Sequence, residues 1–230
     1  MVFLALLDGT VTAFVLALIA LGLSLVFGVM RIVNVAHGEF FMLGAVISWF
    51  AYHWTDDALW GFVLALLAAP VIVGAIAVIS ERYILRKVDY NPESTIVATI
   101  GILYVIQQLT LMGFGPEARP VEAPIYFRVV FPWFGYSGYK LLVAAMSGLC
   151  LCGVWIFMKR SKLGLYMRAT QQDHEIATTF GVPTKKIYAS VFALGGGLAA
   201  LAGVLVVPIR QADHLMGLEP LLLSFIVVII

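Results

Sequence analysis

Residues 59–80 read LWGFVLALLAAPVIVGAIAVIS, an apolar run that contains no charged side chain. About 20 such residues in a helix cross the hydrocarbon core of a bilayer, which is about 30 Å thick. Lipid offers no hydrogen-bond partner to the backbone, so only helices and closed barrels cross this layer. This stretch therefore predicts a membrane-spanning helix.

Other apolar runs extend this reading in both directions along the chain. Hydrophobic residues make up 62% of the sequence and charged residues 12%, against about 25% charged in soluble domains. We therefore predict an all-α fold, a polytopic transmembrane helix bundle, formed by a single membrane domain over residues 1–230. Besides 59–80, the predicted spans are 9–30, 94–113, 140–158 and 187–207.

Two further apolar stretches, 40–52 and 220–230, are shorter than a span. As a helix, 220–230 would extend over only about 16 Å. We therefore expect the natural protein to continue beyond Ile230, so that the domain is incomplete at its C-terminal side.

The composition argues against several function classes. A net charge of +1 gives no basis for nucleic-acid binding. The sequence has no Walker-type phosphate loop, no paired catalytic carboxylates and no metal-ligand spacing. Cys150 and Cys152 lie inside an apolar run and are interpreted as packing residues. We expect that this chain is not an enzyme and binds no metal and no cofactor.

The distribution of basic residues predicts the orientation. If 40–52, extended backwards through 33–39, also crosses, ten basic residues share one side: Arg31, Arg82, Arg86, Lys87, Lys159, Arg160, Lys162, Arg168, Lys185 and Lys186. The other side holds Arg119, Arg128, Lys140 and Arg210. Because basic loops stay in the cytoplasm, we expect a multi-pass protein of the cytoplasmic (inner) membrane with an extracytoplasmic N-terminus.

Two connections are long enough to have structure of their own. Segment 114–139 is predicted to be extracytoplasmic, and its four prolines with interleaved aromatic residues favour an ordered cap or hairpin. Segment 159–186 is predicted to be cytoplasmic. Within it, Gly181 is expected to end one helix and Thr184 to cap the next.

Local signals also mark individual helices. Asn91 followed by Pro92 is typical of a helix start and supports the span near 94. Gly195, Ala199 and Gly203 recur every fourth residue, which predicts close helix packing.

Three polar residues, Asn34, His37 and Glu39, stand directly before the short apolar run that starts at Phe40. For that run to fill the membrane, some of 34–39 must lie within it, where an ionised carboxylate costs about 3 kcal/mol. One interpretation is a broken helix whose N-terminal end receives an anionic group such as an amino-acid carboxylate. The other is a set of interfacial or inter-helix contacts that only hold the bundle together.

Two adjacent amides, Gln107 and Gln108, lie within the span 94–113. Such groups either bond to a neighbouring helix or line a wet cavity. Helix-to-helix bonding is the favoured interpretation, and both residues are candidates for the translocation pathway.

The middle of 159–186 is expected to be helical. Ala169, Asp173, Ala177 and Gly181 fall at steps of four and are predicted to share one face. Such a slim ridge can press into a groove of a partner, with Arg168 and Asp173 giving orientation. The alternative is an ordinary solvated connecting helix.

Three separated blocks resemble one family. Residues 34–45 (NVAHGEFFMLGA) resemble the hallmark segment of permeases of branched-chain amino acid ABC importers, the high-affinity leucine–isoleucine–valine type. Glu81-Arg82 with Arg86 is similar to a cytoplasmic segment of that family. A third block resembles its coupling helix: Gly164, Arg168, Ala169, Asp173, Ala177 and Gly181. Leu165 and Lys87 depart from the family's usual arginine and proline.

The resemblance implies a permease that pairs with a second homologous permease in the lipid bilayer. Two cytoplasmic ATPase subunits would hydrolyse ATP, and an extracytoplasmic solute-binding protein would deliver branched-chain or related amino acids. Urea and short-amide permeases share the pattern. A secondary transporter that uses His37 and Glu39 as a proton relay is the main alternative. An intramembrane enzyme that uses these two residues is disfavoured, because the sequence has no nucleophile or metal-ligand set at a usable spacing.

Overall fold

The computed structural model describes residues 2–131 and 134–229. Most of them lie in helices: α1 (Val2–Met30), α2 (His37–Thr55), α3 (Ala58–Tyr83), the short 3-10 helix η1 (Leu85–Val88), α4 (Pro92–Phe114), α5 (Gly138–Arg160), α6 (Lys162–Gln172), α7 (His174–Thr179), α8 (Thr184–Val206) and α9 (Leu218–Ile229). Strands β1 (Arg128–Phe131) and β2 (Phe134–Ser137) form an antiparallel hairpin. The predicted all-α bundle is confirmed.

Five described helices are long and apolar enough to cross a membrane: α1, α3 with η1, α4, α5 and α8. Each lies at one of the five predicted spans and begins before it. Asn91 accepts from the backbone N–H of Ser94 (3.1 Å) and Pro92 is the first residue of α4, as predicted.

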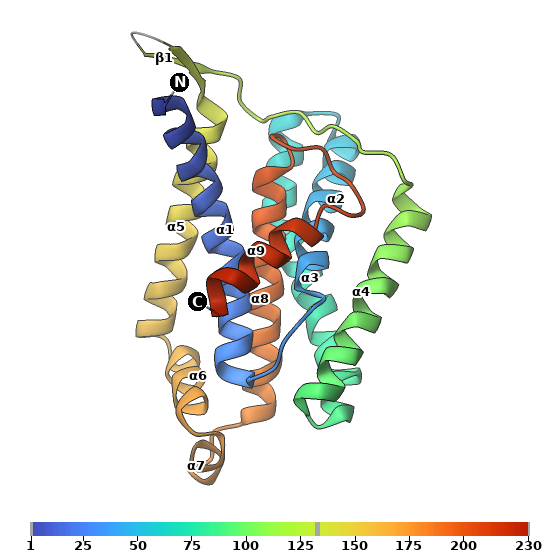
Figure 1. Ribbon diagram of the computed structural model, residues 1–230, viewed down its shortest axis with the longest axis vertical. Coiled ribbons are helices and arrows are strands. Elements are labelled where there is room, and N and C mark those ends of the chain that lie inside the picture. The colour runs from blue at the N-terminus through green and yellow to red at the C-terminus, as the bar shows by residue number, and fades with distance from the viewer. Residues whose placement is uncertain (1, 132–133, 230) are drawn as a thin grey trace.

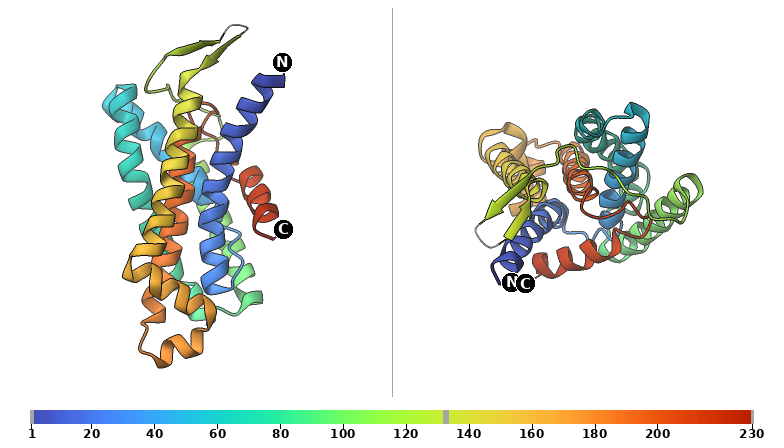
Figure 2. Two further views of the ribbon diagram at one scale, coloured as in Figure 1. Left: turned by 90° about the vertical axis from the view of Figure 1, so that its left-hand side faces the viewer. Right: turned by 90° about the horizontal axis from the view of Figure 1, so that it is seen from above.

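The long helices run roughly side by side, with the β1–β2 hairpin at one end and α6 and α7 at the other (Figure 1). These two ends are called here the hairpin end and the α6–α7 end. The ten basic residues that share a side in the sequence belong to α6 or lie at the termini of helices whose ends face the α6–α7 end. Seen along the bundle axis, α8 lies inside and α4 and α5 lie at the periphery (Figure 2).

Helix α8 packs against its neighbours through glycine and alanine. A Cβ on Gly195 would lie 2.8 Å from the carbonyl oxygen of Gly22 in α1, and one on Gly203 would lie 2.1 Å from that of Phe41 in α2. Small residues at these positions let the backbones approach closely. The predicted packing role of this glycine stripe is confirmed, and Ala199 is also fully buried.

Helix α2 begins inside the bundle. After α1 ends, the extended segment 31–36 turns back from the α6–α7 end, and α2 then continues to the hairpin end (Figure 1). Arg31 starts this reversal with a positive φ of 54°. The stretch predicted to cross, 40–52 extended backwards through 33–39, forms an extended segment followed by α2. Since α2 is not among the described helices that are long and apolar enough to cross by themselves, this crossing stays a prediction.

Helix α9 also begins inside the bundle. After α8 the chain turns at the hairpin end and re-enters, and α9 then runs obliquely across the bundle (Figure 1). Gly217, just before α9, touches Gly38 in the first turn of α2. A Cβ on Gly217 would lie 2.2 Å from the carbonyl oxygen of Gly38. The N-termini of two interrupted helices therefore meet.

Segment 114–139 is ordered over its described residues and contains a hairpin, as expected. Arg128 pairs with Ser137 in the β1–β2 register. Upstream, Arg119 exchanges two backbone hydrogen bonds with Ala212 (2.8 and 2.9 Å), which tie this segment to the loop after α8.

Segment 159–186 differs from the predicted single ridge. It forms two helices, because the chain is extended at Asp173 (φ −152°, ψ 114°), where α6 ends and α7 begins. Steps of four therefore do not place Ala169, Asp173, Ala177 and Gly181 on one continuous face.

The ends of these short helices give one confirmation and one correction. Gly181 has φ +82° and ends α7, as predicted. The expected Thr184 cap is wrong: Pro183 precedes the first turn of α8 and Thr184 is already helical, because the chain turns into the helix one residue earlier.

Candidate translocation and coupling sites

A buried polar cluster surrounds the start of α2. Asn34, His37 and Glu39 each have at most 1% of their surface exposed. The side chain of Asn34 accepts from the N–H of Ala36 (3.1 Å) and so shapes the turn into α2. The N–H of Val35 donates to the Thr99 hydroxyl in α4 (3.2 Å). Side chains thus satisfy backbone groups that an extended segment would leave unpaired.

His37 and Glu39 bond to different helices. Nε2 of His37 donates to the carbonyl oxygen of Ile19 in α1 (3.1 Å). Oε1 of Glu39 accepts from Nε2 of Gln107 in α4 (2.9 Å). The structure therefore joins α1, α2 and α4 through this cluster and does not pair His37 with Glu39.

The cluster is only partly satisfied. Within residues 2–131 and 134–229, Nδ2 of Asn34, Nδ1 of His37 and Oε2 of Glu39 have no hydrogen-bond partner. Gln107 bonds between helices, the favoured interpretation, whereas Gln108 is exposed and lies outside the cluster. Their role in translocation stays a prediction.

The second site is segment 159–186. Gly164 lies against the end of α5, where a Cβ would be 2.4 Å from the carbonyl oxygen of Met158, so this turn requires glycine. Asp173 accepts from the N–H of Ile176 (2.9 Å) and caps α7. Arg168 and Ala169 are half-buried, while Ala177 is the buried residue of α7.

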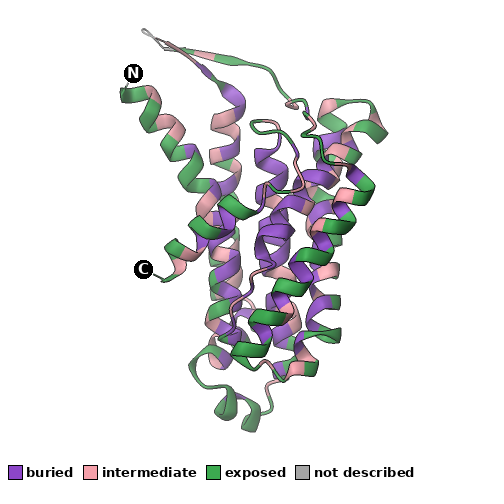
Figure 3. Cartoon of the chain, turned by 45° about the vertical axis from the view of Figure 1, so that its right-hand side comes forward, coloured by how far each residue is buried: buried purple, intermediate pink, exposed green. Residues whose placement is uncertain are grey.

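Four large apolar side chains of this segment are exposed: Leu165, Tyr166, Ile176 and Phe180. Ile176 in α7 is 56% exposed, and Phe180, four residues later at the end of α7, is 84% exposed. The ribbon at this end of the bundle is mostly exposed (Figure 3). Ile176 and Phe180 are called here the apolar tip. Exposed apolar surface beside polar residues is typical of a protein-binding site.

An aromatic contact connects α7 to the bundle. The His174 and Tyr188 rings stack with centroids 5.6 Å apart, and Nδ1 of His174 lies 3.0 Å from the Tyr188 hydroxyl. Tyr90 meets Tyr188 edge-on, with centroids 4.8 Å apart. Tyr188 thus links α7 to α8 and to the loop before α4.

The same connection ends at a buried carboxylate. Glu81, fully buried at the end of α3, accepts from the Tyr90 hydroxyl and pairs with Arg86 (3.1 Å). Burial and this hydrogen bond raise the pKa of Tyr90 well above its usual range. Arg86 also donates to the carbonyl oxygen of Lys185 in the first turn of α8 (3.3 Å). In the sequence, Glu81 and Arg86 stand out only as part of a family block. The signal for their ion pair was an acidic and a basic residue five positions apart at the end of a predicted span.

Comparison with known proteins decides the family. A family model described as branched-chain amino acid transport system / permease component matches residues 5–230. The chain belongs to this family. The resemblance seen in the sequence is confirmed, and with five apolar spanning helices this family member is a multi-pass membrane protein.

Individual members of the permease family are distant in sequence. BraD, a high-affinity branched-chain amino acid transport system permease protein of Pseudomonas aeruginosa, is 27% identical over 87% of this chain and 69% of its own length. The Escherichia coli permease protein LivH is 28% identical over 82% of this chain and 65% of its own length. A probable LivH of Methanocaldococcus jannaschii is 24% identical over 82% of this chain and 61% of its own length.

This family member thus spans about two thirds of the length of the curated relatives it matches. No solved structure matches it.

Proposed function

We propose that this chain is the membrane-spanning permease subunit of an ATP-binding-cassette importer for branched-chain or related amino acids. It lies in the cytoplasmic membrane with its α6–α7 end in the cytoplasm and its N-terminus outside. The relatives BraD and LivH are named as branched-chain amino acid permeases, which supports the solute class, and the basic residues at the α6–α7 end support the orientation.

The apolar tip carries this proposal. Ile176 in α7 and Phe180 at the end of α7 are 56% and 84% exposed within the described chain, at the end with the basic excess. A cytoplasmic ATPase subunit accepts this tip in a groove. A second homologous permease and an extracytoplasmic solute-binding protein at the hairpin end complete the importer, and ATP is hydrolysed on the ATPase subunits.

Coupling follows from the contacts behind the tip. When the ATPases close, they displace α7, and the stacked His174–Tyr188 pair transmits the displacement to α8. Because α8 packs backbone-to-backbone on α1 and α2, the core moves as a unit and carries the cluster of Asn34, His37 and Glu39 with it. Alternation between outward and inward access results from this motion.

The decisive test is uptake by proteoliposomes that contain the assembled complex. Radiolabelled leucine should accumulate only when ATP is hydrolysed, and collapse of ion gradients should leave uptake unchanged. Uptake that follows an ion gradient without ATP would contradict the proposal and favour a secondary transporter. Labelled urea and a short amide in the same assay separate the related substrate classes.

Variants of the tip test the coupling. Phe180→Asp should abolish ATP-dependent uptake while the protein stays folded, because a charge replaces an exposed anchor. Thr179→Asp, which adds the same charge to the neighbouring exposed residue, is the matched control and should retain most uptake. Equal effects of the two would indicate a general charge effect and contradict specific docking.

Other variants in segment 159–186 test whether coupling depends on the geometry of α7 or on the charge of Asp173. Asp173→Arg removes the α7 cap, and Gly181→Trp forces a side chain into a left-handed conformation, so both should abolish coupled uptake. Asp173→Asn keeps a capping oxygen and should preserve uptake if capping is the role of Asp173.

A further inference from the structure

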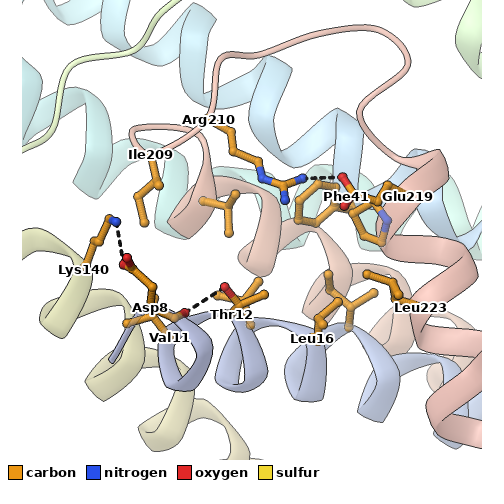
Figure 4. A pocket seen from close by; sticks show the side chains of 14 residues that line it. Asp8, Val11, Thr12, Leu16, Phe41, Lys140, Ile209, Arg210, Glu219 and Leu223 are labelled. Carbon is orange, nitrogen blue, oxygen red and sulfur yellow. Dashed lines mark hydrogen bonds and ion pairs between the residues drawn. The ribbon is translucent and has the colours of Figure 1, made fainter. Parts of the chain in front are cut away.

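A cavity of about 200 Å³ lies towards the hairpin end, between α1, α2, α5, α8 and α9 (Figure 4). It is separate from both the polar cluster and the coupling segment. Most of its wall is apolar and includes Val11, Leu16, Phe41, Ile209 and Leu223. Pockets for drug-sized ligands measure roughly 300–1,000 Å³, so this one suits a small, largely apolar molecule.

Two ion pairs border this apolar space (Figure 4). Lys140 pairs with Asp8 (2.6 Å), and Asp8 also accepts from the Tyr136 hydroxyl (2.9 Å), so this pair holds α1, α5 and the hairpin together. Arg210 pairs with Glu219 (2.8 Å), and in the described chain neither of these side chains makes another hydrogen bond.

Of the two ion pairs, Arg210–Glu219 is therefore the one whose partners a charged ligand can replace. Its side chains are 48% and 65% exposed, and exposed ion pairs contribute little stability. A guanidinium binds a carboxylate through two parallel hydrogen bonds, and a carboxylate accepts from an ammonium. One cation and one anion beside an apolar space match a zwitterion with an aliphatic side chain.

We infer that this cavity is a binding site for the transported amino acid within the membrane subunit. Arg210 binds the α-carboxylate, Glu219 accepts from the α-ammonium, and the aliphatic side chain lies against the wall formed by Val11, Leu16 and Leu223. The inference rests on the proposed function, because it assigns a site to the same solute class.

The cavity also borders the family motif. Ile19, which lines it, provides the carbonyl that bonds to His37. Phe41, another wall residue, lies one helical turn after His37 in α2. A bound amino acid therefore contacts the helix that starts at the polar cluster, which places the site next to the proposed pathway.

Binding of radiolabelled leucine to the detergent-solubilised complex of permeases and ATPases, without the solute-binding protein, tests the site by equilibrium dialysis. Leu16→Trp fills the cavity and should weaken leucine binding by at least roughly tenfold. Leu6→Trp is the matched control, because Leu6 lies on the same helix, is 63% exposed and does not line the cavity. It should bind leucine as the unmodified complex does.

A second variant separates recognition from structural damage. Isocaproate is leucine without its α-amino group, so the unmodified complex should prefer leucine. Glu219→Gln should reduce this preference by roughly tenfold, since it removes the partner of the ammonium. A purely structural role of Glu219 would weaken both ligands equally and leave the preference unchanged.

The outcomes distinguish the two proposals. If the unmodified complex takes up leucine with ATP but Leu16→Trp binds leucine like Leu6→Trp, the cavity assignment is wrong and the proposed function stands. An unchanged leucine-to-isocaproate preference in Glu219→Gln also overturns the assignment. If the unmodified complex takes up no branched-chain amino acid, the proposed function fails and this inference fails with it.

Discussion

Helices α5 and α8 have the same length, 23 residues, and both are apolar enough to cross a membrane. Nevertheless α8 is buried along almost its whole length, whereas α5 buries only residues in the half near the hairpin: Gly138, Tyr139, Val143 and Ser147. Lipid is as apolar as leucine, so hydrophobicity alone does not decide which helix is central.

The placement of glycine accounts for the difference. Gly195 and Gly203 in α8 meet backbone atoms of α1 and α2, whereas a Cβ on Gly153 in α5 would meet nothing within 4 Å. The outer face of α5 is thus free for lipid or for a partner permease. The variants below test this contrast, in order of decreasing expected effect.

The largest effect is expected for Gly203→Leu. Its Cβ would lie 2.1 Å from the carbonyl oxygen of Phe41, and backbone cannot move aside as a side chain can. We expect a loss of about 3 kcal/mol or more, at the upper limit of overpacking. Thermal unfolding in detergent and the monodisperse fraction measure it. Gly153→Leu should unfold like the unmodified protein, and equal losses in both would refute the packing contrast.

The second effect concerns the Glu81–Arg86 ion pair at the C-terminal end of α3. Arg86→Leu leaves the buried Glu81 carboxylate without its ion-pair partner. Breaking a fully buried pair costs roughly 3–5 kcal/mol. Since the Arg86 side chain is 30% exposed, we expect a smaller loss of about 2 kcal/mol. Thermal unfolding compared with Arg82→Leu, which removes an exposed charge nearby, measures the difference.

The third effect lies on α4, which buries residues along its length and bonds through Gln107 to Glu39. Gln107→Ala should cost about 1 kcal/mol, as measured for hydrogen bonds between membrane helices. Gln108→Ala, at the exposed neighbouring position, should cost nothing measurable.

Glu39→Ala should lower transport more than protein abundance; equal losses of both would assign this residue a purely structural role.

The smallest expected effect is an increase in stability. Gly153 in α5 and Gly101 in α4 have no neighbouring atoms where a Cβ would stand. Alanine is favoured over glycine inside helices by about 0.8–1 kcal/mol, so Gly153→Ala and Gly101→Ala should each raise the unfolding temperature slightly. A decrease in either variant would show that the face has an unrecognised packing partner.

The sequence was sufficient for the elements that depend on local composition. Apolar run lengths gave the five spans, Pro92 gave the start of α4, and Gly181 gave the end of α7. The glycine spacing of α8 also predicted its close packing correctly.

Features that depend on competing local preferences or on distant contacts were missed. Asp173 was interpreted as part of a helix face, although aspartate is also a strong helix cap, and Glu175 in the first turn of α7 was a signal for a new helix. The contact between Gly38 and Gly217 joins residues far apart in the chain, so no local pattern predicts it. The cavity beside Arg210 is assembled from five helices and was likewise not predictable.

The meeting of α2 and α9 at Gly38 and Gly217 has an electrostatic consequence. Each helix N-terminus carries about half a positive elementary charge, so two like poles abut inside the bundle. Glu39 in the first turn of α2 and Glu219 in the first turn of α9 bring one negative charge each, when ionised, to this junction. When ionised, the Glu39 carboxylate offsets part of the repulsion that opposes joining these helices head to head, whereas the charge of Glu219 is shared with Arg210.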